Sequence, residues 1–293
     1  MKKKMTLFLT VLLILVTLTG CGTGSTNGSH VRADTLVVPG EIKGDVFYED
    51  VSDAFRQSLW AFAGKTSASV MGAEPDQNSL YSPVSLYYAL AMLEAGAAGR
   101  TKEDLRNFLE AGDQTKIGEE LRSLYALMTV EGEGEAEQIA NALWARKDLV
   151  GQDGAGVKQA WLDQMADHFY ASAFAVDFTD PGTADRMSRW VEKETRGKIK
   201  PDMDISDPDL LLVLMNTVYF KADWLEPFPE ESIKKDLFYG VEEALEQVPY
   251  LRGSFDSHSV LVTDRFTAGQ LPLVNGHMRF VLPDEGLTPE DLL

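Results

Sequence analysis

One apolar run sets the architecture that this chain can adopt. Residues 209–220 (DLLLVLMNTVYF) are almost continuously apolar, and Asn216 places an amide in the middle of the run. A short run of this kind is typical of a β-strand that is covered on both faces. Asn216 would then be buried and would need hydrogen-bond partners. We therefore expect a central strand with a polar group inside it.

Helical periodicity fills the first two thirds of the chain, and short strand-like segments fill the rest. Helices are expected at 51–65, 83–96, from 101 onward, 117–130, 156–171 and 183–196. Strands are expected at 139–145, 174–178 and 209–220. Segregated helices and strands of this kind indicate an α+β fold.

Local signals predict how some of these elements begin and end. Ser82 precedes Pro83, so we expect Ser82 to cap the second helix with the proline at its first position. Gly197 follows the last predicted helix and is expected to close it in a left-handed conformation. The glutamate-rich segment 131–137 is expected to be a solvated loop, with a metal trap as the less favoured alternative.

The N-terminus has the pattern of an export signal. Lys2 to Lys4 precede an apolar run from Thr6 to Thr19, which is shorter than the roughly 20 residues that span a bilayer. The run ends in Leu18-Thr19-Gly20-Cys21, which resembles a bacterial lipobox and predicts that Cys21 is lipidated. An ordinary signal peptide with a chance cysteine is the alternative. We expect a signal peptide at 1–20, a flexible tether at 21–50 and a globular domain at 51–293, anchored on the outer side of the cytoplasmic membrane.

Charge and cysteine content exclude several classes of function. The net charge is −19, and such a surface repels nucleic acids and anionic headgroups. Cys21 is the only cysteine, so the chain forms no internal disulfide and no thiolate cluster for a metal. Nucleic acid is therefore not an expected partner, and no cofactor is expected.

Candidate catalytic and metal-binding groups do not form a convincing set. The four histidines are His30, His168, His258 and His277, and none lies at metal-ligand spacing from another. Ser82 lacks the glycine-flanked elbow of a nucleophile. The acidic cluster at 202–209 lacks the glycine and the final glutamate of a calcium loop, so a solvated turn is favoured. We expect neither a catalytic residue nor a metal site, and hence not an enzyme.

Several stretches together resemble the serpin family. The match consists of NSLYSPVSLYYALAM at 78–92 with GAAGRT at 96–101, IANALW at 139–144, WVEKETRGKI at 190–199, NTVYFKADWLEPF at 216–228, and QLP with FVLPDEG between 270 and 286. These blocks follow in family order from about Val51 to the last residue. The resemblance implies a helical cluster packed on three β-sheets. It also implies a serine endopeptidase as partner, trapped when a cleaved reactive loop inserts into the main sheet.

The resemblance assigns positions to four residues. Ser82, Ser85 and Asn216 match a polar cluster at the centre of the main sheet, where insertion separates the strands. Trp224 matches a tryptophan near the end of the sheet where the loop begins to enter. Support of the fold is the alternative role for all four, and it is favoured over direct contact with a partner.

The same resemblance implies that the reactive loop and the last strands follow residue 293, so that the chain is truncated and non-inhibitory as it stands. Leu210 to Tyr219 would then present an apolar edge that favours aggregation. We expect a monomeric, surface-tethered protease inhibitor in the full-length protein. A non-inhibitory serpin-fold binding protein and a non-functional fragment remain the alternatives.

Overall fold

The computed structural model describes residues 34–42, 44–73, 78–112, 116–151, 156–239, 244–254 and 258–292. The predicted signal peptide, Cys21 and His30 lie outside this part of the chain. The helices are α1 (Asp53–Met71), α2 (Pro83–Gly96), α3 (Gly99–Phe108), α4 (Ile117–Leu127), α5 (Gln159–Phe169) and α6 (Pro181–Glu194). The strands are β1 (Asp34–Val37), β2 (Val130–Gly132), β3 (Glu135–Arg146), β4 (Ala171–Val176), β5 (Leu212–Ala222), β6 (Lys234–Tyr239), β7 (Ala244–Tyr250), β8 (Val260–Val262), β9 (Phe266–Leu273) and β10 (Gly276–Pro283).

These strands form three sheets, and with the helices they confirm the predicted α+β class. The main sheet has the order β1-β4-β3-β2, and β5 pairs with the opposite edge of β3. β3 and β5 are antiparallel over their whole length, whereas β3 and β4 are parallel. A second sheet has the order β10-β9-β8, and β6 pairs with β7. Among the described strands, β3 is the one partner of β5.

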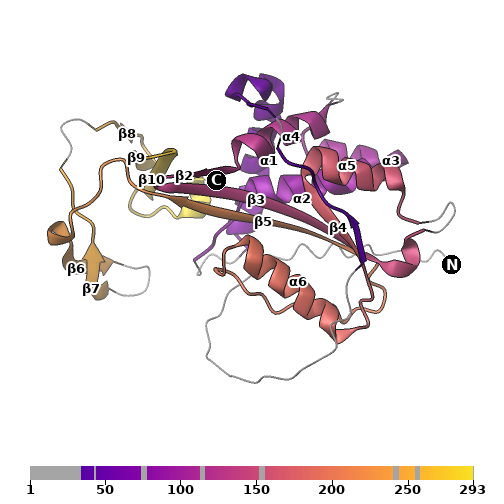
Figure 1. Cartoon of the computed structure of the whole chain (residues 1–293). Helices are drawn as coiled ribbons and strands as arrows, with labels where there is room; N and C mark the ends of the chain where they lie inside the picture. Colours follow the sequence, from indigo (N-terminus) through magenta and orange to yellow (C-terminus); the bar gives the residue numbers. More distant parts are fainter. Residues whose placement is uncertain are drawn as a thin grey trace, which may run out of the picture.

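Side chains alternate between the two faces of the main sheet, and each face packs against a different hydrophobic core. On β3, Ile139 and Leu143 pack into the core formed by α1 to α5, while Ala142 and Trp144 pack into a second core beneath α6. Figure 1 shows the helical cluster on one side of β3 and β5 and α6 on the other. β5 likewise contributes side chains to both cores, so the prediction of a strand covered on both faces is confirmed.

The ends of α2 and α6 also match the sequence signals. Ser82 caps α2 by accepting a hydrogen bond from the backbone N–H of Ser85, and Pro83 is the first helical residue. After α6, Arg196 has φ +52° and Gly197 has φ +77°, and the Gly197 N–H donates to the Glu192 carbonyl at 2.7 Å. This is a Schellman closure in which an arginine takes the first left-handed position.

Two sequence expectations need correction. Residues 21–50 were expected to form a tether that packs only through short apolar pieces such as residues 36–38. Leu36 and Val37 do pack against the main core, but they belong to β1, which pairs antiparallel with β4 as part of the main sheet. The segment 131–137 was expected to be a loop, but β2 and β3 form a hairpin there with Gly134 at φ +79° in its turn. Both differences come from pairing with distant or neighbouring strands, which overrides the polar composition of each segment.

Candidate functional site

The first part of the site is the N-terminus of α2, where the two predicted serines meet. The Ser85 hydroxyl donates to the Ser82 hydroxyl oxygen at 3.0 Å, and the Ser85 N–H donates to the same atom at 3.3 Å. The Ser82 hydroxyl oxygen therefore accepts hydrogen bonds from donors at the start of the helix, including a backbone N–H that has no partner within the helix. This geometry is that of a helix cap, and it does not activate the Ser82 hydroxyl as a nucleophile.

The second part is a pair of asparagines at the centre of the sheet. Asn141 on β3 lies directly opposite Asn216 on β5, and the Asn216 Nδ2 donates to Asn141 Oδ1 at 2.7 Å. Asn141 is 2% exposed, and its own Nδ2 donates to the Phe169 carbonyl at the end of α5 at 2.6 Å. The asparagine pair thus joins both strands to the helical cluster.

Asn141 was not among the predicted site residues. It lies in the block that was matched to a strand, and an amide inside that apolar segment was the available signal. The other amide oxygen of the pair, Asn216 Oδ1, is buried and accepts no hydrogen bond from the described residues. A buried acceptor without a donor lowers the stability of the fold by about 1–3 kcal/mol. Asn216 Oδ1 can therefore still accept a favourable hydrogen bond.

The serine pair and the asparagine pair lie on elements that pack together. α2 packs on β5, and Leu214 and Val218, which flank Asn216 on the same face of β5, belong to the core under α2. No hydrogen bond joins the two pairs within the described residues. Two predicted residues, Ser82 and Ser85, thus lie at the start of α2, and the third, Asn216, lies on the strand that α2 packs against. Asn141 joins this set through its hydrogen bond with Asn216.

Trp224 lies apart from these residues. It follows β5, eight residues beyond Asn216, which corresponds to roughly 26 Å along a strand. Its ring packs edge-to-face on Phe228 at 5.6 Å between centroids, and its backbone bridges to Leu273 on β9. An open cavity of about 450 Å³ lies next to this pair of rings, lined by Glu226–Pro229, Ser232 and Arg252–Ser254.

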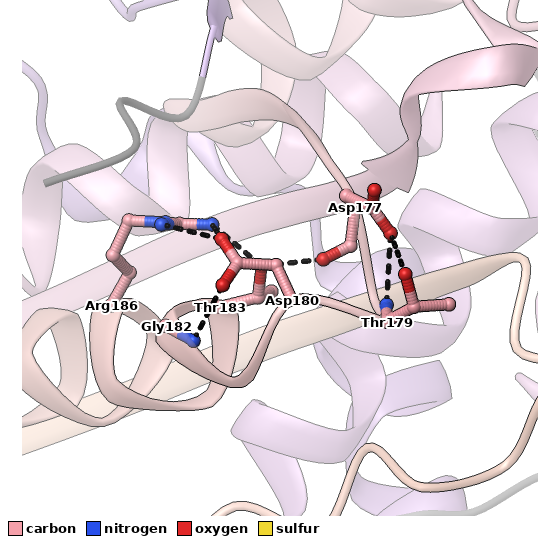
Figure 2. A network of polar contacts seen from close by, with 6 residues as sticks. All are labelled: Asp177, Thr179, Asp180, Gly182, Thr183 and Arg186. Atoms are coloured by element: carbon pink, nitrogen blue, oxygen red, sulfur yellow. Dashed lines mark hydrogen bonds and ion pairs between the residues drawn. The ribbon is translucent and has the colours of Figure 1, made fainter. Parts of the chain in front are cut away.

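Polar contacts stabilise the start of α6 and join its C-terminal end to the sheet. At the N-terminus, Asp180 accepts from the Gly182 N–H at 2.9 Å and pairs with Arg186 at 3.4 Å (Figure 2). At the C-terminus, Arg196 pairs with Glu131 of β2, and its guanidinium lies 4.8 Å from the Tyr219 ring centroid on β5. α6 is therefore held to the strands it crosses as well as by its apolar face.

We expect acid to loosen the C-terminal end of α6. The Arg196 guanidinium lowers the pKa of Glu131 below its ordinary value of 4.5, so the pair stabilises the fold fully above that value. This contribution is lost as the pH falls through the lowered pKa of the folded state. Hydrogen exchange of the α6 amides at pH 6 should be faster in Glu131→Gln than in wild type by a factor of about two to five. Glu133→Gln, in the same hairpin, is the control, and equal exchange in both variants would contradict the prediction.

Metal binding and membrane crossing find no support in the described residues. No group of three or more His, Cys, Asp or Glu residues there is arranged to hold a metal ion. In the acidic cluster at 202–209, Asp204 accepts from Ser206 and Asp207 accepts from the Asp209 N–H, as in solvated turns. In the same part of the chain, no helix combines the length and hydrophobicity needed to cross a bilayer.

A family model for serpins, described as serine protease inhibitors, matches residues 57–292. The chain therefore belongs to the serpin family. The family is described as serine protease inhibitors, which act on enzymes and are not enzymes themselves.

Individual relatives agree with this assignment. The chain is 32% identical to neuroserpin of Homo sapiens over 188 residues, which cover 61% of the chain and 44% of the relative. It is 27% identical to alpha-1-antiproteinase of Rattus norvegicus over 253 residues, which cover 83% of the chain and 60% of the relative. The chain thus spans about half the length of these relatives.

Solved structures show the same fold. The thermophilic serpin tengpin in its latent state aligns with a TM-score of 0.69 at 23% identity, covering 83% of this chain and 64% of tengpin. Thyroxine-binding globulin complexed with thyroxine-fluorescein aligns with a TM-score of 0.70 at 26% identity, covering 81% of this chain and 71% of the globulin chain. The predicted serpin-like fold is confirmed.

Proposed function

We propose that the protein to which this chain belongs inhibits a serine endopeptidase by inserting a cleaved reactive loop into the main sheet beside β5. The protease supplies the nucleophile, and the inhibitor supplies a strand that completes a sheet. In this proposal the loop and the remaining strands follow residue 293, and residues 1–293 alone are non-inhibitory.

The observation that carries the proposal is the open edge of β5. Its 11 residues pair with β3 on one side, and no described strand occupies the other side. An unpaired edge of this length offers a row of backbone N–H and C=O groups to an added strand. Asn216 Oδ1 lies buried on this same strand without a donor, so a strand that brings a donor would gain a hydrogen bond.

We propose a place in this mechanism for each predicted site residue. Ser82 and Ser85 lie at the start of α2 and Asn216 lies on β5, and α2 packs on β5, so separating β5 from a neighbour would disturb the packing between these two elements. Trp224 lies beyond the end of β5, where an inserting strand would begin to pair. We propose that all four act mainly by supporting the fold at these two places.

The test compares this chain with the product of its native source. The intact mass of the native protein is measured first, and a mass well above 32.4 kDa would show a longer product. That product is then incubated with trypsin and with subtilisin and run on a denaturing gel. We expect a denaturant-resistant covalent complex for the longer product and none for residues 1–293. A complex with residues 1–293, or cleavage of the longer product without any complex, would overturn the proposal.

We propose further that the protein is a lipoprotein held on the outer side of the cytoplasmic membrane through Cys21, and that it is monomeric. The lipobox-like residues 18–21 support the anchor. Metabolic labelling with palmitate should mark the wild-type chain and leave Cys21→Ser unlabelled. Equal labelling of both forms would remove Cys21 as the site.

A serpin-fold binding protein without inhibitory activity is the second candidate. The similarity to thyroxine-binding globulin, and the 30% identity to corticosteroid-binding globulin of Homo sapiens over 237 residues, favour it. In that case the longer product would be cleaved in the gel experiment as an ordinary substrate. Small residues in the loop hinge would instead favour the inhibitor.

A further inference from the structure

Helix α1 and the turn before it carry an exposed row of aromatic side chains. Phe47, Tyr48 and Trp60 are 61%, 63% and 73% exposed, whereas Phe55 and Phe62 of the same helix are fully buried. α1 therefore buries Phe55 and Phe62 in the core and exposes Trp60 to solvent. We call Phe47, Tyr48 and Trp60 the aromatic ridge.

Arg56 lies between the two parts of the ridge in the chain. The Arg56 guanidinium lies 4.1 Å from the Tyr48 ring centroid and pairs with Asp53, and Trp60 follows one helical turn after Arg56 on the same face. The structure thus already shows how a guanidinium is held here, with a ring beneath it and a carboxylate at its side.

Exposed carboxylates lie near Phe47 and Tyr48 in the chain, and hydrogen bonds fix the turn that carries these two residues. Besides Asp53, the exposed acidic residues next to it in the chain are Asp45, Glu49 and Asp50. The Phe47 N–H donates to Asp50 Oδ2 at 2.8 Å, and the Asp50 N–H donates to the Phe47 carbonyl at 2.9 Å. The Ser52 N–H donates to Glu120 of α4 at 2.8 Å, which ties the turn to the helical cluster. A rigid surface of this kind loses little entropy when it binds.

We propose that the aromatic ridge binds an arginine-containing basic segment of a partner protein. Exposed tryptophan and tyrosine are typical anchors of protein interfaces, and the flanking carboxylates select a cationic partner. The same carboxylates disfavour anionic lipid headgroups and nucleic acids. Arginine should be preferred over lysine because its planar guanidinium stacks on aromatic rings.

The experiment uses the whole chain with end-capped deca-arginine and deca-lysine as probes. The two peptides carry the same charge, so non-specific attraction to the acidic protein contributes similarly to both. Isothermal titration calorimetry should show about ten-fold tighter binding of deca-arginine. Trp60→Ser should reduce this preference to about two-fold or less. Tyr239→Ser, which removes a 78% exposed aromatic on β6, should retain it.

Three results would overturn the proposal. Equal affinity for both peptides would show that only net charge is recognised. Equal loss of preference in Trp60→Ser and Tyr239→Ser would show that the ridge is not the site. Binding to phosphatidylcholine vesicles that depends on Trp60 would assign the ridge to a lipid surface. Circular dichroism of Trp60→Ser verifies folding, and the outcome is independent of protease inhibition.

Discussion

Replacing Asn141 by alanine is expected to lower the free energy of unfolding by about 2–4 kcal/mol. The substitution leaves two groups without partners in a buried position: the Phe169 carbonyl and the Asn216 amide N–H. It also removes the polar link between the main sheet and the end of α5. Urea unfolding followed by circular dichroism measures the change in the midpoint, with an unchanged slope as the sign of a pure stability effect.

The control for this prediction is Asn107→Ala, which removes an exposed asparagine from α3. Its effect should stay within about 0.5 kcal/mol. A double-mutant cycle with Asn216→Ala should show a coupling of about 1 kcal/mol, because one hydrogen bond is counted in both single variants. Additive effects of the two substitutions would mean that the observed 2.7 Å contact contributes nothing to stability.

Replacing Phe62 by alanine is expected to have a larger effect, a loss of about 3–5 kcal/mol. Phe62 is fully buried and packs edge-to-face on Tyr87 at 5.1 Å and on Phe108 at 5.8 Å between ring centroids. The substitution opens a cavity between α1, α2 and α3. Urea unfolding measures the loss, and Phe238→Ala, which truncates a 47% exposed side chain on β6, is the control.

A second measurement on Phe62→Ala reports the same cavity by a different property. Burial raises the pKa of Tyr87 to about 12, so its neutral form is favoured in the folded state. Water that enters the cavity should lower this pKa toward the ordinary value of 10. Ultraviolet absorbance during alkaline titration follows tyrosine ionisation directly. A tyrosine titration identical to that of wild type would show that the core closes around the missing ring.

The elements that could be predicted from the sequence are those with strong local signals. The apolar run around Asn216 predicted β5, and the Ser82–Pro83 pair predicted the start of α2. Gly197 likewise predicted the end of α6. Each of these signals depends on residues within a few positions of one another, so no knowledge of the rest of the fold was needed.

The missed features depend on strand pairing, either with a distant segment or within a polar hairpin. β1 forms because Thr35 and Val37 pair with β4, more than 130 residues away, and four residues carry little signal alone. The hairpin at 130–137 was missed because its glutamate-rich composition indicates a solvated loop. In the structure these glutamates alternate along a partly exposed pair of strands. Asn141 became part of the site only when the register placed it opposite Asn216. The roles of Cys21, Ser82, Ser85, Asn216 and Trp224 remain proposals.

The pairing of β1 with β4 gives the molecule a mechanical property. Any tension applied to the N-terminus enters the described fold at Asp34 and is borne first by the three residue pairs that join β1 to β4. β4 leads within a few residues to Asp180, the cap of α6, so the load reaches the helix that crosses the sheet. When the pull runs along the strand, the three residue pairs are sheared together, so β1 bears the load before the rest of the described domain does.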